Sequence, residues 1–149
     1  VATQVPHAAL RVYVMGDRGA NREPATEQDR RRMAQLTAEG LKAGAFGFST
    51  SRTLNHKAAD GRHIPTLRAE EAELTTIAHA MRDTGMGWLQ IVSDFEDQQG
   101  EIGLFRRLAR ESRRPVTISL LQQHGYSVSE LAGGVAAWEV AGLPLQRAT

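Results

Sequence analysis

Segments with β-strand character alternate with segments of helical periodicity along most of this chain of 149 residues. Apolar, β-rich runs predict strands at 10–16, 45–50, 87–93, 116–121 and 127–131. Apolar residues at helical spacing predict helices at 26–43, 69–84, 101–112 and 135–140. This alternation is typical of parallel β/α units with right-handed crossovers. We therefore expect an α/β protein with an open, mainly parallel sheet of four or five strands and flanking helices.

Local signals mark where the expected helices begin and end. Thr26, followed three residues later by Asp29, forms a shortened capping box and predicts a helix start. Gly44 and Gly85 follow the last apolar residues of the first two helices and predict left-handed stops. Pro115 predicts a break before the strand at 116–121, because proline cannot continue a helix.

The charges of the chain are nearly balanced, with 18 basic and 17 acidic side chains and a formal net charge of +1. This balance argues against a nucleic acid or an anionic membrane as a partner. The arginines at 30–32 stand among acidic residues on one expected helix, so we expect a solvated face with pairs such as Glu27–Arg31. No apolar run approaches the ~20 residues that a membrane-spanning helix needs.

Cysteine is absent from the chain. Disulfides, thiolate metal ligands and a cysteine nucleophile are therefore excluded. The absence fits a reducing compartment, and we expect a cytoplasmic location.

The long polar loops at 17–25, 51–66 and 94–100 all follow expected strands, and the ends after parallel strands form the binding face of such folds. Asp94 is placed as a strand-end catalytic acid, with a loop or N-cap carboxylate as the alternative. Arg52 is a candidate clamp for a substrate carboxylate, and His56 is a candidate proton relay. Ser49 and Asn55 complete the candidate substrate-binding set. For Arg52 and His56 a solvated loop is the alternative. His7 is expected before the first strand, away from the site, in a structural role.

Residues 6–122 resemble the N-acyl-D-amino-acid deacylase (D-aminoacylase) branch of the amidohydrolase superfamily. The likeness lies in the segments "PHAALRVYVMGDRGANREPAT", "AGAFGFSTSRTLNH", "GMGWLQIVSDFED" and "RRPVTISLLQ". The resemblance implies part of a (β/α) barrel, hydrolysis of C–N amide bonds, a small-molecule N-acyl amino acid as substrate, and zinc as the cofactor of the complete family.

Residues 120–149 resemble the carboxyl end of a rhodanese domain, in "LLQQHGYSVSELAGGVAAWEVAGLPL". We therefore expect a hybrid with an amidohydrolase fragment at 1–122 and a rhodanese-like strand and helix at 123–149. A natural divergent protein is the alternative. Sulfurtransferase chemistry needs a cysteine, and the chain has none. The resemblance of the tail therefore implies homology to rhodanese without sulfurtransferase activity.

The resemblance places two metal-binding histidines of the family near Val92 and Leu120, which are apolar and cannot bind zinc. The five histidines of the chain show neither H-x-H nor H-E-x-x-H spacing. We therefore expect no metal site and little or no activity of this chain alone. The alternative function is a non-catalytic α/β interaction module, and exposed sheet edges predict a possible homo-oligomer.

Overall fold

Four short strands form one parallel sheet in the order β1-β2-β3-β4. The structure is a computed structural model that describes residues 3–120. The strands are β1 (Gln4–Pro6), β2 (Gly47–Arg52), β3 (Trp88–Ser93) and β4 (Val116–Leu120). The helices are α1 (His7–Met15), α2 (Asp17–Ala20), α3 (Glu27–Lys42), α4 (Glu71–Thr84) and α5 (Gln98–Ser112). The expected α/β architecture, an open parallel sheet with flanking helices like part of a barrel, is confirmed.

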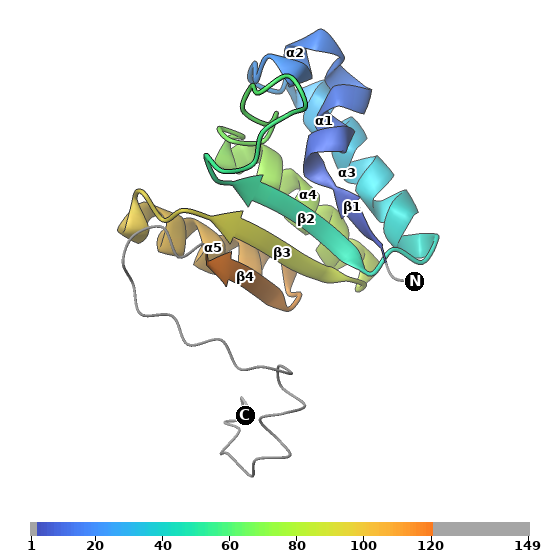
Figure 1. Cartoon of the computed structure of the whole chain (residues 1–149). Helices are drawn as coiled ribbons and strands as arrows, with labels where there is room; N and C mark the ends of the chain where they lie inside the picture. The colour runs from blue at the N-terminus through green and yellow to red at the C-terminus, as the bar shows by residue number, and fades with distance from the viewer. Residues whose placement is uncertain (1–2, 121–149) are drawn as a thin grey trace.

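The helices α3, α4 and α5 lie on one side of the sheet, and Figure 1 shows them behind the strands. Contacts between α3 and α4 and between α4 and α5 join them into a single layer. The other side of the sheet, which we call the open face, has no helix from residues 3–120 over it. Side chains alternate between the two sides along each strand. The open face consists of Gln4, Pro6, Gly47, Ser49, Ser51, Trp88, Gln90, Val92, Thr117 and Ser119.

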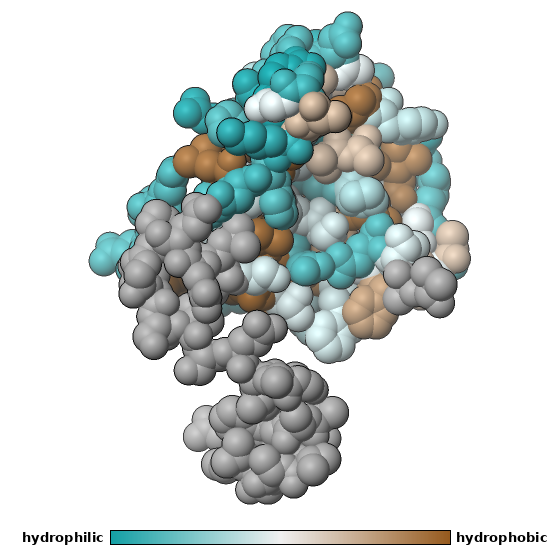
Figure 2. Space-filling view, viewed as in Figure 1, coloured by the Kyte–Doolittle hydropathy of each residue, from teal (hydrophilic) through white to brown (hydrophobic). Residues whose placement is uncertain are grey.

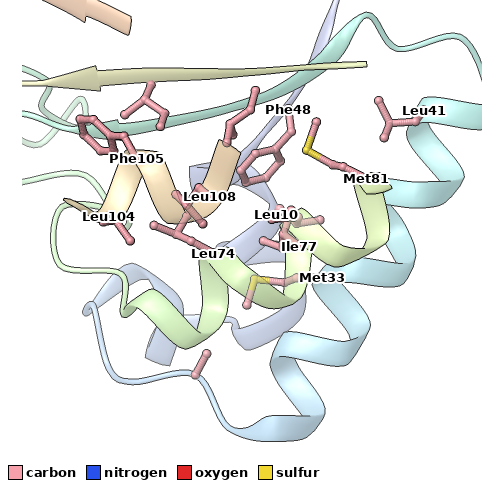
Figure 3. Packing of buried hydrophobic residues seen from close by; sticks show 14 of the residues in the cluster. Leu10, Met33, Leu41, Phe48, Leu74, Ile77, Met81, Leu104, Phe105 and Leu108 are labelled. Atoms are coloured by element: carbon pink, nitrogen blue, oxygen red, sulfur yellow. The ribbon is translucent and has the colours of Figure 1, made fainter. Parts of the chain in front are cut away.

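The hydrophobic core fills the space between the sheet and the helix layer. Phe48 points into it from β2, and Ile77, Met81 and Met33 meet it from the helices (Figure 3). Ile91 of β3 belongs to the same cluster. Each of these five side chains is at most 1% exposed. The inward periodicity of the second and third expected helices is also confirmed by the buried positions Leu74, Ile77, Met81, Leu104, Phe105 and Leu108. Burial of this hydrophobic core therefore drives the packing of α3, α4 and α5 against the sheet.

The expected capping signals are present in the structure. The Thr26 side chain accepts from the Asp29 backbone N–H while the Asp29 side chain accepts from the Thr26 backbone N–H, which confirms the capping box. Gly85 ends α4 in the left-handed conformation with φ of 66°. Gly47 serves a different purpose, because a Cβ there would lie 2.2 Å from the carbonyl oxygen of Trp88. The close approach of β2 and β3 therefore requires glycine at this position.

The strand expected at 10–16 is wrong, because these residues belong to helix α1. The first strand is Gln4–Pro6, directly before that helix. The β-rich string "LRVYVM" misled the prediction, although its inward positions Leu10, Arg11, Val14 and Met15 follow helical spacing. The loop expected at 17–25 likewise contains the short helix α2. Tertiary contacts of one helical face thus outweigh the β-propensity of the string.

The expected strand at 127–131 and helix at 135–140 lie outside the described residues. Among the helices of residues 3–120, none combines the length and the apolar character that a membrane crossing requires.

A buried polar cluster joins the first β/α unit to the second. The Glu73 carboxylate of α4 lies between His7 and Arg11 of α1, with 2.6 Å between His7 Nε2 and Glu73 Oε1 and a hydrogen bond from Arg11 to Glu73 Oε2. The other ring nitrogen, His7 Nδ1, lies 2.9 Å from the Thr50 hydroxyl of β2. All three charged or titratable side chains are at most 2% exposed. We call His7, Arg11, Thr50 and Glu73 the buried cluster.

Burial sets the protonation states in the buried cluster. Burial lowers the pKa of His7 below its ordinary value of 6.5 and outweighs the opposing pull of the Glu73 carboxylate. Burial by itself raises the pKa of Glu73, but the hydrogen bonds from His7 and Arg11 and the charge of Arg11 outweigh it, so this pKa falls below 4.5. Both pKa shifts fit a neutral His7 that donates a hydrogen bond from Nε2–H to Glu73 and accepts one at Nδ1 from the Thr50 hydroxyl.

We expect Glu73→Ala to lower the free energy of unfolding by about 3–5 kcal/mol, because it leaves the Arg11 guanidinium buried without its carboxylate. Urea denaturation measures the change. Glu71→Ala is the matched control on the same helix. Glu71 forms an exposed ion pair with Arg107 that solvent screens, so its loss should change the free energy of unfolding much less. Equal destabilisation by the two variants would contradict the importance of the buried carboxylate.

Stability should fall as the pH drops. At pH values between the lowered pKa of folded His7 and 6.5, His7 is protonated in the unfolded chain but not in the folded chain. The free energy of unfolding therefore decreases as the pH falls below about 6.5. The lowered pKa of Glu73 adds a second loss as the pH falls below 4.5 and through its folded pKa. His7→Gln should remove the first part of this dependence. Denaturation at pH 7 and at pH 5 tests it, and an unchanged difference in His7→Gln would refute the assignment.

Candidate functional site

A pocket of about 380 Å³ lies on the open face at the carboxyl ends of β1, β2 and β3. We call it the rim pocket. Its wall comes from the strands, from the start of α1 and from the long loop between β2 and α4. The lining residues are Pro6, His7, Ala8, Ser49, Thr50, Ser51, His56, Ile64, Thr66, Gln90 and Val92. The carboxyl ends of parallel strands thus meet at one polar hollow, as the fold class predicts.

Ser51 and His56 form a hydrogen-bonded pair at the rim pocket, with 2.8 Å between Ser51 Oγ and His56 Nδ1. Thr66 stabilises the end of β2, because its hydroxyl donates to the Ser51 carbonyl at 2.8 Å. Gln90 stands beside Ser49 in the strand register and supplies a side-chain amide. The pocket therefore offers hydroxyl, imidazole and amide groups next to the apolar side chain of Val92.

His7 lies at the rim pocket, which corrects its expected position away from the site. Because the first strand is Gln4–Pro6, His7 follows the carboxyl end of a strand instead of preceding one. Both of its ring nitrogens are engaged, by Thr50 and by Glu73. His7 therefore lines the pocket and also supports it as part of the buried cluster.

Asp94 follows β3 and is only 6% exposed. Its carboxylate accepts from the Thr53 hydroxyl at 2.5 Å, from the Leu54 backbone N–H at 2.7 Å and from the Asn55 side-chain amide at 3.3 Å. These contacts fasten the first turn of the loop after β2 to the end of β3. In this geometry Asp94 and Asn55 position the loop that carries His56.

Arg52 lies at a second pocket of about 490 Å³ on the helix side of the rim, between the beginnings of α4 and α5. Its Nε donates to the Glu101 carboxylate at 3.1 Å, and a second nitrogen donates to the Ala69 carbonyl at 3.0 Å. Glu101 also accepts from the Ser93 hydroxyl. Arg52 thus joins the end of β2 to Glu101 on α5 and to Ala69, just before α4.

The structure brings two of the five candidate residues to the rim pocket, Ser49 and His56. Asp94 and Asn55 anchor the neighbouring turn, and Arg52 lines the pocket on the other side of the sheet. Sequence reasoning missed Ser51, Thr66 and Gln90 of the rim pocket, and it missed Glu73 of the buried cluster. Alternation along β2 and β3 was the signal for Ser51 and Gln90. For Glu73 the signal was an acid at an inward helical position, four residues before Ile77.

The side chains around the rim pocket do not form a set of zinc ligands. Val92, where the resemblance places a histidine, lines the pocket with an apolar side chain. His7 has both ring nitrogens in hydrogen bonds. Over residues 3–120, no three His, Asp or Glu side chains lie close enough together to hold a metal ion. The described residues therefore do not fit the zinc site of the complete family.

A parallel β/α sheet with a polar pocket over its strand ends is an arrangement found in barrel enzymes. A model of the Amidohydrolase family matches residues 1–148, and the chain belongs to this family. The match extends across residues 123–148, where the sequence also resembles a rhodanese tail, and that second resemblance stays a prediction. No curated protein and no solved structure gives a significant match to the chain.

We expect Asp94→Asn to loosen the turn at 53–55, because one oxygen of the carboxylate is replaced by an amide group that cannot accept. A hydrogen bond to a charged group contributes about 1.5–3 kcal/mol, so backbone exchange at Leu54 should rise about tenfold or more. Hydrogen–deuterium exchange measures this rate. Glu96→Gln, an exposed change two residues away, is the control. Equal exchange in both variants would contradict the anchoring role.

Proposed function

We propose that this chain is part of a hydrolase that acts on the C–N bond of N-acyl-D-amino acids, and that the rim pocket receives the acyl amide. The observation that carries the proposal is the position of the rim pocket at the carboxyl ends of three parallel strands in an amidohydrolase chain. The likeness of residues 6–122 to the D-amino-acid branch supports the substrate class.

The groups of the rim pocket suit a small amide. Ser49 and Gln90 offer hydrogen-bond donors and acceptors to the carbonyl and N–H of the substrate. Ile64 and Val92 provide apolar contacts for the hydrocarbon of the acyl group. His56, hydrogen-bonded to Ser51 and exposed, offers an imidazole that can pass a proton to or from the substrate.

Two features argue that the chain binds such a substrate without efficient turnover. The described residues lack a ligand set for the zinc ion that activates water in the complete family. The carboxylate clamp also needs rearrangement, because Arg52 is paired with Glu101 and lies outside the rim pocket. In this geometry Arg52 does not contact a substrate bound in the rim pocket.

The experiment is a binding and turnover assay with the purified chain. N-acetyl-D-leucine should bind, and NMR titration should show binding weakened at least about fivefold by His56→Ala, which is near 1 kcal/mol. His79→Ala is the matched control, since this half-exposed histidine pairs with Glu111 on the helix layer. Amine release should stay at the uncatalysed rate with added zinc. Equal binding by the two variants would refute the pocket assignment, and turnover that Asp94→Ala abolishes would refute the expected inactivity.

The proposed hybrid origin concerns residues 110–130, where the two resemblances meet. One uninterrupted genomic reading frame through these codons would establish a natural join. Two separate genes would show the join to be an artefact.

A further inference from the structure

Within residues 3–120, two side-chain hydroxyls hydrogen-bond a histidine, and both belong to the end of β2. Thr50 Oγ1 lies 2.9 Å from His7 Nδ1, and these residues are only 4% and 1% exposed. Ser51 Oγ lies 2.8 Å from His56 Nδ1, where Ser51 is half-buried and His56 is exposed. Side chains alternate along β2, so Thr50 points to the helix layer and Ser51 to the open face. Ser51 and His56 are therefore the pair that a molecule in the rim pocket can contact.

The surrounding chain holds this serine and this histidine close together. Ser51 belongs to β2, and the Thr66 hydroxyl donates to its carbonyl at 2.8 Å. The turn at 53–55, directly before His56, is fastened to β3 by the Asp94 carboxylate. The two groups thus come from a strand and from an anchored turn. Neither needs a large rearrangement before a proton passes between them.

The rim pocket contains the groups that an acyl transfer to serine requires. When the ring proton of His56 is on Nε2, Nδ1 accepts a hydrogen bond from the Ser51 hydroxyl and can take its proton. Gln90 lies on the same face of β3, two residues before the register partner of Ser51. Its amide N–H can donate to the oxyanion that forms when Oγ attacks a carbonyl. Ile64 and Val92 provide apolar contacts for the acyl chain.

The loop that carries His56 gives the rim pocket a hydrophilic side. Figure 2 shows strongly hydrophilic residues over the loop between β2 and α4, above the paler residues of intermediate hydropathy on the strands. His56 itself is exposed. Water can therefore reach an acyl group on Ser51, and hydrolysis of an acyl-enzyme requires such access.

We propose that Ser51 is the nucleophile of an esterase reaction in which His56 is the general base. Ser51 Oγ attacks the carbonyl carbon of the ester while its proton passes to His56 Nδ1. The bond between this carbon and the leaving oxygen then breaks, and the alkoxide takes the proton from His56. Water next attacks the acyl carbon and gives a proton to His56. Ser51 Oγ leaves with that proton, and a carboxylic acid is released.

The pair suits esters with a good leaving group better than amides. An amine must be protonated as it leaves, and a carboxylate behind the imidazole supports that step in serine hydrolases. In the part of the chain that the structure describes, His56 has no such carboxylate partner. We therefore expect aryl esters to react and amides to stay intact. This activity does not depend on the N-acyl-D-amino acid proposed above, so either proposal can fail without the other.

Reaction of the purified full chain with p-nitrophenyl acetate, in the presence of EDTA, tests the proposal. We expect a burst of p-nitrophenolate and one acetyl group on Ser51, located by mass spectrometry of peptides. Ser51→Ala and His56→Ala should each lower the rate at least about tenfold. Ser119→Ala is the matched control and should leave the rate unchanged. Ser119 lies on the open face of β4 at the level of Ser51, but outside the rim pocket.

Cysteine variants give a second measurement that does not depend on turnover. The chain contains no cysteine, so Ser51→Cys introduces its only thiol. A neighbouring imidazole favours the reactive thiolate. Iodoacetamide should therefore alkylate Ser51→Cys at least about tenfold faster than Ser119→Cys. His56→Ala in the Ser51→Cys background should remove the difference.

Three results would overturn the proposal. The first is acetylation spread over lysines, with hydrolysis unchanged by Ser51→Ala. The second is hydrolysis that needs His56 but not Ser51, because the imidazole would then act alone. The third is equal alkylation of Ser51→Cys and Ser119→Cys, because no base would then act on the side chain at position 51. Ser51→Cys keeps a side chain of similar size, so this last measurement decides the matter even if Ser51→Ala does not fold.

Discussion

The carboxylate of Glu73 is the point at which three parts of the structure meet. It lies between an imidazole and a guanidinium of α1, and the imidazole reaches β2 through Thr50. Transfer of these groups out of water costs several kcal/mol for each ion, and only hydrogen bonds of good geometry offset that cost. The angle between the first strand, the first helix and α4 is therefore set by polar contacts as well as by apolar burial.

This buried cluster matters for function because it lies directly beneath the rim pocket. His7 belongs to both, so the floor of the pocket is fixed by a buried network while His56 on the loop above stays exposed. Asp94 supplies the second fixed point, because it fastens the start of that loop to the end of β3. The site thus combines a rigid floor with a loop anchored at one end, an arrangement that holds polar groups ready for a ligand.

The sequence was sufficient for the elements whose signals are local. The capping box at Thr26, the stop at Gly85 and the inward faces of α4 and α5 depend on neighbouring residues and were predicted correctly. The helix at 7–15 was not, because its β-rich string is helical only through contacts with α3, β2 and Glu73. Among the candidate site residues, alternation on β2 separates Ser49 from Arg52, which end on opposite sides of the sheet. Register between strands, which brings Gln90 beside Ser49, cannot be read from one strand alone.

The most direct test of the central role of Glu73 is a double-mutant cycle with Arg11→Met, Glu73→Gln and the combined variant. Free energies of unfolding from urea denaturation give the coupling energy. We expect about 2 kcal/mol or more, because either single change leaves a buried polar group without its partner. Changes that add to within about 0.5 kcal/mol would show that the two side chains act independently, and would contradict the role assigned to the buried cluster.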